Sequence, residues 1–283
     1  MLHPSCRIFH PFPWERAGAR EKWLNKTSCG LTGMLQTNDL IFPDWAAPPN
    51  VKAFFTTRTG GVSTGVHASL NLGAHVGDAP LHVAENRHRV RELLPAAPVW
   101  LNQVHGVNVI FADAVGASIA PSLAADASVS ETKNTVCAVL VADCLPVLFC
   151  VDDGSRVGVA HAGWRGLHSG VLERTVSAMG ADPAKILAWM GPAIAANAFE
   201  VGQDVFDAFT CVSREDADAF RPIRDKADKY LADIYALARR RLQRAGVRKI
   251  FGGKFCTVSE KARFFSYRRD GQTGRMAALI WLE

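Results

Sequence analysis

The stretch from Val136 to Gly166, VCAVLVADCLPVLFCVDDGSRVGVAHAGWRG, constrains the fold of this chain more than any other. Its short apolar runs predict buried strands, and two of them end at residues that can bind a metal, Cys144 and His161. Because side chains alternate along a strand, two strand faces are predicted. The first carries Val136, Ala138, Leu140, Ala142 and Cys144, and the second carries Val157, Val159 and His161. Open α/β sheets bind ligands at strand ends, so we expect the chemistry there.

The composition is that of an ordinary globular protein. The chain has 283 residues, 48% of them apolar, which suffices for one large or two small domains. It contains no run of about 18 uncharged apolar residues, so no membrane-spanning helix is expected. Residues 1–33 lack the apolar core of a signal peptide. We expect them to be a disordered extension or a misassigned start upstream of Met34, with residues 34–283 forming one catalytic domain.

Net charge and cysteine content indicate which binding partners and which cellular compartment to expect. The net charge is +5, but residues 1–33 contribute +3, which leaves 27 basic and 25 acidic residues in the rest of the chain. This balance predicts neither a nucleic-acid nor a membrane partner. Seven cysteines without a CxxC pair predict reduced thiols and a cytoplasmic location. Cys137 and Cys150 lie inside apolar runs and are expected to be inert core thiols.

The hydrophobic spacing predicts an alternation of strands and helices in one α/β domain. Outside the central stretch, strands are expected at 51–57, 99–104, 107–111, 186–190, 248–251 and 276–282. Helices are expected at 82–94, 169–179, 199–209 and 230–245. The small residues of 121–130, which include Asp126, are expected to form a connection. No GxGxxG or Walker sequence is present, so the usual nucleotide-binding fingerprints are missing.

A third potential ligand, His105, follows another apolar run and precedes a glycine. Two imidazoles and one thiolate are the ligands expected of a zinc ion that keeps its fourth position open for catalysis. The same three residues could also be two hydrogen-bonded histidines near a buried thiol. Spacing alone does not decide between a metal centre and this plain alternative.

Several motifs resemble the bacterial YfiH/YlmD family, which is also known by a laccase-domain label, as a peptidoglycan editing factor family, and by its mammalian member FAMIN. The resemblance covers residues 40–282. Its motifs occur in order as RTGGVS, SLNLG, WLNQVHG, VLVADCLPVLF, VGVAHAGWRGL, GPAI, FEVG and SYRRDGQTGR. In that family a His, a Cys and a second His bind zinc, and these positions correspond to His105, Cys144 and His161 here.

The resemblance implies a cytosolic enzyme of purine nucleosides. It implies phosphorolysis of adenosine, inosine, guanosine and methylthioadenosine, together with deamination of adenosine. The implied fold is a layered α/β sandwich, similar to that of a bacterial deamidating toxin with a catalytic Cys and His. Zinc is the implied cofactor, and copper could also bind such a set of ligands.

The residues near the motifs suggest how these reactions could work. For deamination, a metal-activated water would attack the purine C6, and Asp143 could transfer protons. Its alternative role is that of a strand-end aspartate that caps backbone N–H groups. For phosphorolysis, arginines must hold the dianionic phosphate. The candidates for substrate binding are Arg58, Asn71, Arg165, Arg268, Arg269 and Arg275.

Two other enzyme classes remain open on the sequence. A cysteine hydrolase or amidase, for example one acting on peptidoglycan precursors, would use Cys144 as nucleophile with His161 or His105 as base. A copper polyphenol oxidase is less favoured, because a multicopper site needs about ten histidines. The chain has nine histidines and no His-x-His pair.

Overall fold

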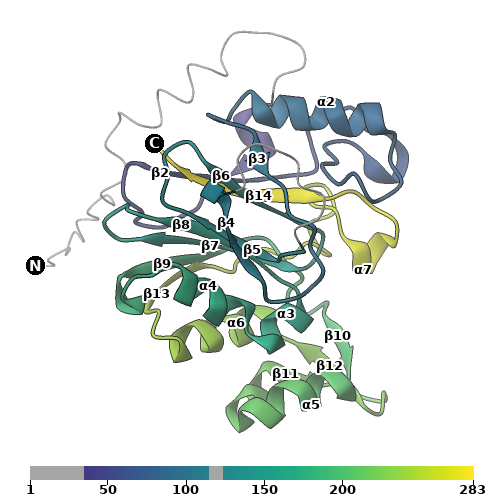
Figure 1. Cartoon of the computed structure of the whole chain (residues 1–283). Coiled ribbons are helices and arrows are strands. Elements are labelled where there is room, and N and C mark those ends of the chain that lie inside the picture. Colours follow the sequence, from purple (N-terminus) through teal and green to yellow (C-terminus); the bar gives the residue numbers. More distant parts are fainter. Residues whose placement is uncertain (1–34, 115–123) are drawn as a thin grey trace, which may run out of the picture.

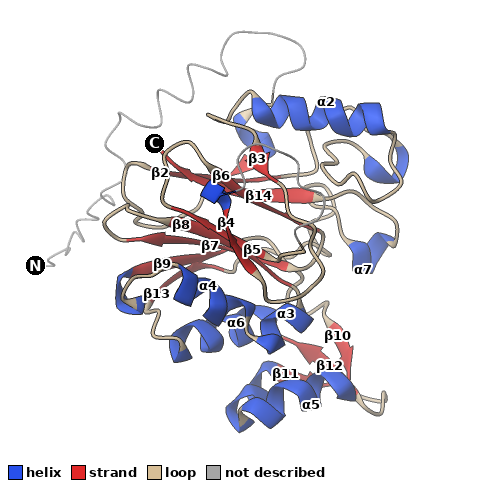
Figure 2. Cartoon of the chain, viewed as in Figure 1, coloured by secondary structure: helices blue, strands red, loops and turns tan. Residues whose placement is uncertain are grey.

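The computed structural model describes residues 35–114 and 124–283. The expected extension, residues 1–33, lies outside the described residues. Two large sheets and one small sheet are present in the described part of the chain (Figures 1 and 2). None of the helices in these ranges is long and apolar enough to cross a membrane.

The first large sheet has five strands in the order β1-β2-β14-β6-β3. They are β1 Leu40–Ile41, β2 Val51–Thr56, β14 Met276–Leu282, β6 Val136–Val141 and β3 Pro98–Val99. Helix α2, Pro80–Arg91, lies over its outer face (Figure 1). Val90 of α2 and Leu93, two residues after its end, belong to one buried cluster with Leu140 of β6 and Trp281 of β14. The burial of this apolar layer attaches α2 to the sheet.

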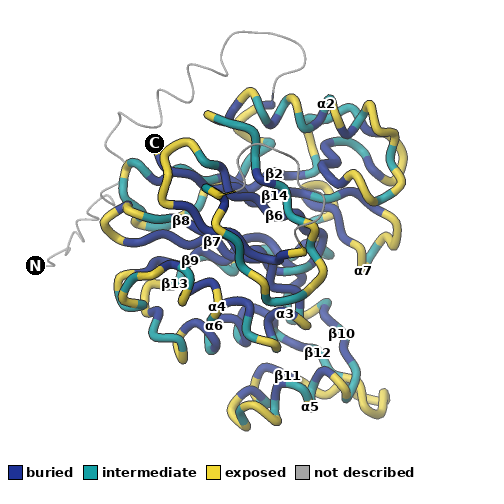
Figure 3. The backbone as a smooth tube through the Cα atoms, in the orientation of Figure 1, coloured by how far each residue is buried: buried dark blue, intermediate teal, exposed yellow. Residues whose placement is uncertain are grey.

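The second large sheet has six strands in the order β13-β9-β7-β8-β5-β4. They are β13 Lys249–Gly252, β9 Ile186–Met190, β7 Leu145–Val151, β8 Val157–Ala162, β5 Ala127–Ser130 and β4 Val109–Phe111. Its outer face is covered by α3 Trp164–Ser169, α4 Val171–Ala178 and α6 Ile234–Arg244. The central strands are buried between these helices and the first sheet (Figure 3).

The inner faces of the two sheets share one apolar core. Val139 of β6 and Ile280 of β14 meet Leu148 of β7 and Val159 of β8 there. The layers therefore run helix, sheet, sheet, helix, which confirms the predicted single layered α/β sandwich.

The chain passes from one sheet to the other inside the stretch from Val136 to Gly166. Strand β6 belongs to the first sheet and β7 to the second, so residues 142–144 form the crossing. Asp143 has a positive φ of 86° there, which breaks the strand alternation. The prediction that Cys144 shares a face with Val136 and Leu140 is therefore wrong. Those two pack beneath α2, whereas Cys144 packs against the core between the sheets.

The strand predicted at 99–104 ends at Val99. Beyond Val99, the side chain of Gln103 makes the two hydrogen bonds to β6 that the backbone of a neighbouring strand would otherwise make. Its Nε2 donates to the carbonyl of Leu140 at 2.8 Å, and its Oε1 accepts from the N–H of Leu140 at 2.7 Å. The chain is thereby free to turn towards His105 while Leu140 remains satisfied.

Three other predictions differ from the structure, one because of long-range strand pairing and two because of a local turn or cap. Residues 127–130, predicted as connection, form β5. The helix predicted at 169–179 begins at Trp164 and is interrupted at Gly170, whose φ is 98°. The helix predicted at 230–245 begins at Ile234, because Asp233 caps it by accepting from the N–H of Ala236.

A small three-stranded sheet projects from the sandwich together with helix α5 (Figure 1). Its strands are β10 Glu200–Gly202, β12 Lys229–Ala232 and β11 Phe220–Pro222, and α5 spans Gln203–Val212. The helix predicted at 199–209 is thus divided between β10 and α5. The rings of Phe206 and Tyr230 stack at 4.6 Å and hold the unit together.

Candidate metal centre

His105, Cys144 and His161 converge at one end of the sandwich. Their potential ligand atoms all lie within 4.8 Å of one another. The Sγ of Cys144 is 3.7 Å from Nε2 of His105. The two imidazole rings meet edge to face, with centroids 4.8 Å apart. Within the described ranges this is the one group of three or more His, Cys, Asp or Glu side chains that could hold a metal ion.

The three side chains come from different parts of the sandwich and differ in burial. His161 lies on β8 and is 3% exposed. Cys144 is half-buried at the crossing between the sheets, and His105 is exposed on the loop after β3. An ion held by these ligands would therefore face protein on one side and solvent on the other. This arrangement suits a metal with an open coordination position better than a closed structural site.

Asp126 lies behind the two histidines and was missed as a functional residue in the sequence. Its Oδ1 is 2.8 Å from Nδ1 of His161, which leaves Nε2 of that ring for a metal. Burial alone would raise the pKa of Asp126. Hydrogen bonds from His161 and from the backbone of Gly106 and Val104 outweigh burial and hold this pKa below its ordinary value.

The electrostatics favour a charged pair at the centre of the site. Burial alone would raise the pKa of Cys144, but the neighbouring His161 and His105 lower it to about 6. Burial would lower the pKa of His161, but Cys144 and Asp126 raise it to about 9. At neutral pH the sulfur is therefore a thiolate, the form that binds metals and attacks carbon.

Two glycines allow the helix that follows β8 to approach these ligands. A Cβ on Gly163 would lie 2.8 Å from Cδ2 of His105 and 3.0 Å from Sγ of Cys144. A Cβ on Gly166 would lie 2.8 Å from the carbonyl oxygen of Gly106. The spacing of the HAGWRG motif thus reflects close packing against the site.

The donor set fits a divalent metal such as zinc. Bond lengths of about 2.3 Å to sulfur and 2.0–2.1 Å to nitrogen in a tetrahedron put the two donor atoms about 3.6 Å apart. The observed separation between Sγ of Cys144 and Nε2 of His105 is 3.7 Å. The pair of Cys144 and His105 fits such an ion without rearrangement.

Two of the predicted phosphate-binding arginines retain free donor groups beside this centre. Arg165 is exposed, and its guanidinium stacks 4.5 Å above the Trp164 ring, directly after Gly163. Arg275 is half-buried, and its Nη1 donates to the carbonyls of Thr273 and Gly274. Cys144 and Asp143 are near enough for their negative charges to act on Arg275.

The other predicted substrate residues are occupied by internal contacts. Arg58 donates to the carbonyls of Ala68 and Lys261. Asn71 is fully buried and bonds Gly73, Asp78 and the N–H of Arg275. Arg269 donates to Thr257, Val258, Phe264 and Asp270. Arg268 is exposed, and its guanidinium is directed to β10, where Nη1 donates to the carbonyl of Glu200. Arg58, Asn71 and Arg269 therefore brace loops, and Arg268 links helix α7, Tyr267–Asp270, to β10.

Asp143 is 8% exposed and both of its oxygens are occupied. Oδ1 accepts from the Thr257 hydroxyl at 2.5 Å. Oδ2 accepts from the Ser266 hydroxyl at 3.0 Å and from the N–H of Arg268 at 2.6 Å. The contact with the N–H of Arg268 is of the capping kind that was the alternative to proton transfer, and the other two contacts are with hydroxyl groups.

A hollow of about 380 Å³ adjoins Arg275, within the usual size range of small-molecule sites. Tyr267, at the start of the short helix α7 Tyr267–Asp270, borders it with 62% of the residue exposed. The full lining is His75, Val76, Tyr267, Gly271, Gln272, Thr273 and Arg275.

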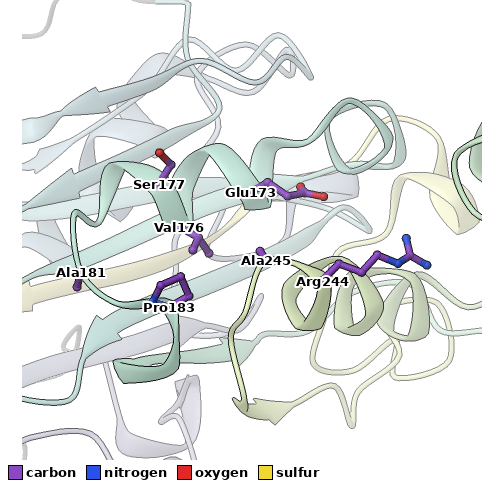
Figure 4. A pocket seen from close by; sticks show the side chains of 7 residues that line it. All are labelled: Glu173, Val176, Ser177, Ala181, Pro183, Arg244 and Ala245. Carbon is purple, nitrogen blue, oxygen red and sulfur yellow. The ribbon is translucent and has the colours of Figure 1, made fainter.

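A larger hollow of about 540 Å³ lies between α4 and α6 (Figure 4). It is bordered by Glu173 and Arg244 together with small and apolar side chains, and it includes none of the residues predicted for the site. The larger of the two hollows therefore does not coincide with the candidate metal centre.

The layered sandwich with its His, Cys, His centre defines the class of the protein. Residues 52–283 match the family described as multi-copper polyphenol oxidoreductase laccase, and the chain belongs to this family. The resemblance to YfiH and YlmD proteins is thereby confirmed, as the individual relatives also indicate.

Purine nucleoside phosphorylase YfiH of Escherichia coli is 56% identical over 245 residues, which are 86% of this chain and 98% of the relative. Purine nucleoside phosphorylase PA4543 of Pseudomonas aeruginosa is 52% identical over 87% of this chain and 99% of its own length. Among solved structures, Neisseria meningitidis protein NMB0706 has a TM-score of 0.83 and 53% identity, covering 87% of this chain and 99% of that one. YlmD from Geobacillus stearothermophilus has a TM-score of 0.78 and 31% identity, covering 88% and 98%.

Proposed function

We propose that this protein is a zinc-dependent purine nucleoside phosphorylase whose active site is built on His105, Cys144 and His161. The observation that carries the proposal is the convergence of these three side chains at a partly open site. The names of relatives that share half or more of its residues over nearly their whole length support the same reaction. The free cysteines of the described residues fit the proposed cytoplasmic location.

In phosphorolysis, a phosphate oxygen bonds to C1′ of the ribose while the bond from C1′ to the purine nitrogen breaks. The base then leaves with a proton, and ribose 1-phosphate remains. Arg165 and Arg275 are the side chains that we assign to the phosphate, because both have guanidinium groups that can pair with it. The hollow beside Arg275 would receive the nucleoside, with Tyr267 as an aromatic surface for the base.

A bound zinc would supply Lewis-acid chemistry and lower the pKa of a water molecule. That chemistry also supports the proposed second activity, deamination of adenosine to inosine. Asp143 is a poor proton carrier for this step, because both of its oxygens already accept hydrogen bonds. The substrate range that we propose includes adenosine, inosine, guanosine and methylthioadenosine.

The test is to incubate the purified protein with each nucleoside, with and without phosphate, and to measure free base, ribose 1-phosphate and inosine by chromatography. Metal content is determined on the same sample. We expect base release that depends on phosphate and about one zinc per chain. Base release at the same rate without phosphate would indicate a hydrolase and contradict the proposal.

The cysteine hydrolase alternative draws support from one observation, the lowered pKa of Cys144 beside two histidines. A metal-free protein that is inactivated by a thiol-directed substrate analogue would favour it. A copper polyphenol oxidase is a weaker alternative, since the described residues offer one group for a metal and a multicopper site needs several. Phenol oxidation requiring stoichiometric, tightly bound copper would support that activity.

A further inference from the structure

The carboxylate of Asp126 holds both metal-binding histidines at once. Asp126 has no exposed surface, yet four N–H groups converge on its two oxygens. Oδ1 lies 2.8 Å from Nδ1 of His161 and 2.9 Å from the backbone nitrogen of His105. Oδ2 lies 2.6 Å from the nitrogen of Gly106 and 3.2 Å from that of Val104.

The contact between Oδ1 of Asp126 and Nδ1 of His161 orients the His161 ring. Strands β5 and β8 are antiparallel, with Ala127 opposite Ala160, so Asp126 falls opposite His161. The N–H of His161 also donates to the carbonyl of Asp126 at 2.7 Å. Backbone and side chain therefore fix the same ring, and its Nε2 is left facing Cys144. Carboxylate partners of this kind set the tautomer and direction of metal-binding histidines.

The remaining contacts act on the backbone of His105. This residue has a φ of 60°, a left-handed conformation that non-glycine residues adopt infrequently. It allows three successive N–H groups, those of Val104, His105 and Gly106, to point at one anion. The negative charge thus selects the turn that aims the His105 ring at the sulfur.

We propose that Asp126 is a positioning residue that assembles the metal site before any ion binds, by fixing the ring of His161 and the turn at His105. This inference rests on the metal dependence proposed above. Asp126 does not touch the ion; it acts through the two histidines.

The test compares Asp126→Asn and Asp126→Ser with the parent protein. Asparagine keeps one acceptor oxygen but turns an NH₂ group towards the N–H groups of Gly106 and Val104. The side chain of serine is shorter, so its oxygen is withdrawn both from the His161 ring and from the backbone N–H groups. Zn²⁺ and Co²⁺ affinities are measured by competition with a chromophoric chelator, and the thiolate-to-Co²⁺ absorption band reports the ligand geometry. We expect about 10- to 100-fold weaker binding in both variants, with an altered band and a parent-like far-ultraviolet circular dichroism spectrum.

Asp113→Asn is the matched control. Asp113 accepts from the hydroxyl of Ser130 at 2.5 Å and from the N–H of Glu131 at 3.0 Å, at the opposite end of β5 from Asp126. It disturbs the same strand without touching a metal ligand, so its metal affinity should stay within about twofold of the parent. If both Asp126 variants also stay within twofold, the inference is wrong.

A second measurement needs no variant. If Asp126 organises the turn in advance, the amide protons of His105 and Gly106 must be protected from hydrogen exchange in the metal-free parent. Rapid exchange there would overturn the inference even if the variants failed to fold. A parent protein that binds no zinc would instead defeat the proposed metal dependence, and amide protection would still decide the role of Asp126.

Discussion

At the scale of the residue, Cys144 could serve either as a metal ligand or as a nucleophile. The neighbouring His161 and His105 keep its sulfur ionised, and an ionised sulfur serves equally as a metal ligand and as a nucleophile. A sulfur bound to an ion donates electron density to it and becomes a weaker nucleophile, so we expect Cys144 to serve only one of these roles in a turnover. Metal content and the fate of this thiol therefore separate the two enzyme classes.

Replacing Cys144 by alanine should remove one of three ligands and with it the metal. The loss of several kcal/mol of transition-state stabilisation corresponds to at least about a 100-fold fall in phosphorolysis. Zinc stoichiometry and the initial rate of base release measure the effect. Cys211→Ser, at an exposed thiol on α5, is the control and should retain parent values. Phosphorolysis at the parent rate in Cys144→Ala would refute the assigned site.

Gly163→Ala tests the close packing of the site. The new methyl group would lie 2.8 Å from the His105 ring and 3.0 Å from the Cys144 sulfur. One or both ligands must move, so we expect metal affinity to fall by about tenfold or more. Chelator competition gives the affinity, and near-ultraviolet circular dichroism checks the fold. An unchanged zinc affinity would show that His105 and Cys144 can move to make room for the methyl group without weakening metal binding, and would contradict this prediction.

At the scale of the element, the sequence could identify ligands but not the segments that hold them. Cys144 and His161 follow apolar runs and are visible in short motifs. The role of Asp126 depends on the pairing of β5 with β8, a long-range contact between segments that carry no mark of it. The small residues of β5 also resemble a connection more than a strand. The face of Cys144 was predicted wrongly for a related reason, because no local pattern shows that the chain changes sheets there.

The side chain of Gln103 satisfies the backbone hydrogen-bonding groups of Leu140 on the side of β6 where no strand continues. Gln103→Ala would leave the N–H and the carbonyl of Leu140 without their partners, at a cost of about 1–3 kcal/mol for each buried group. We expect the free energy of unfolding to fall by about 2 kcal/mol, measured by urea denaturation. The exposed Gln243 on α6 offers a control, for which alanine should change stability by less than about 0.5 kcal/mol.

At the scale of the whole molecule, the layered architecture places the site where the two sheets exchange the chain. The alternation of strands and helices was sufficient to predict one α/β domain. The assignment of strands to two sheets depended on side-chain packing that spacing does not encode. In the projecting unit, β10 and most of β12 were predicted as the first turns of helices, since their apolar residues serve a small core of the unit's own.

Removal of the metal should lower thermal stability across the whole domain. An ion that binds only the folded state stabilises it by about 2.7 kcal/mol when present at one hundred times its dissociation constant. For a chain of this size, that corresponds to a decrease in Tm of about 5–10 °C on chelation. Calorimetry with and without zinc measures the shift. Cys144→Ala should show no such shift, and a parent Tm insensitive to zinc would contradict the metal centre.

The crossing at residues 142–144 gives the proposed ion a further consequence. Its ligands are separated along the chain, since Cys144 lies 39 positions after His105, and they approach the site from different layers. A bound ion would act as a cross-link in the folded state, joining these segments and opposing their local separation. The three side chains proposed for catalysis would then also fasten one layer of the sandwich to the next.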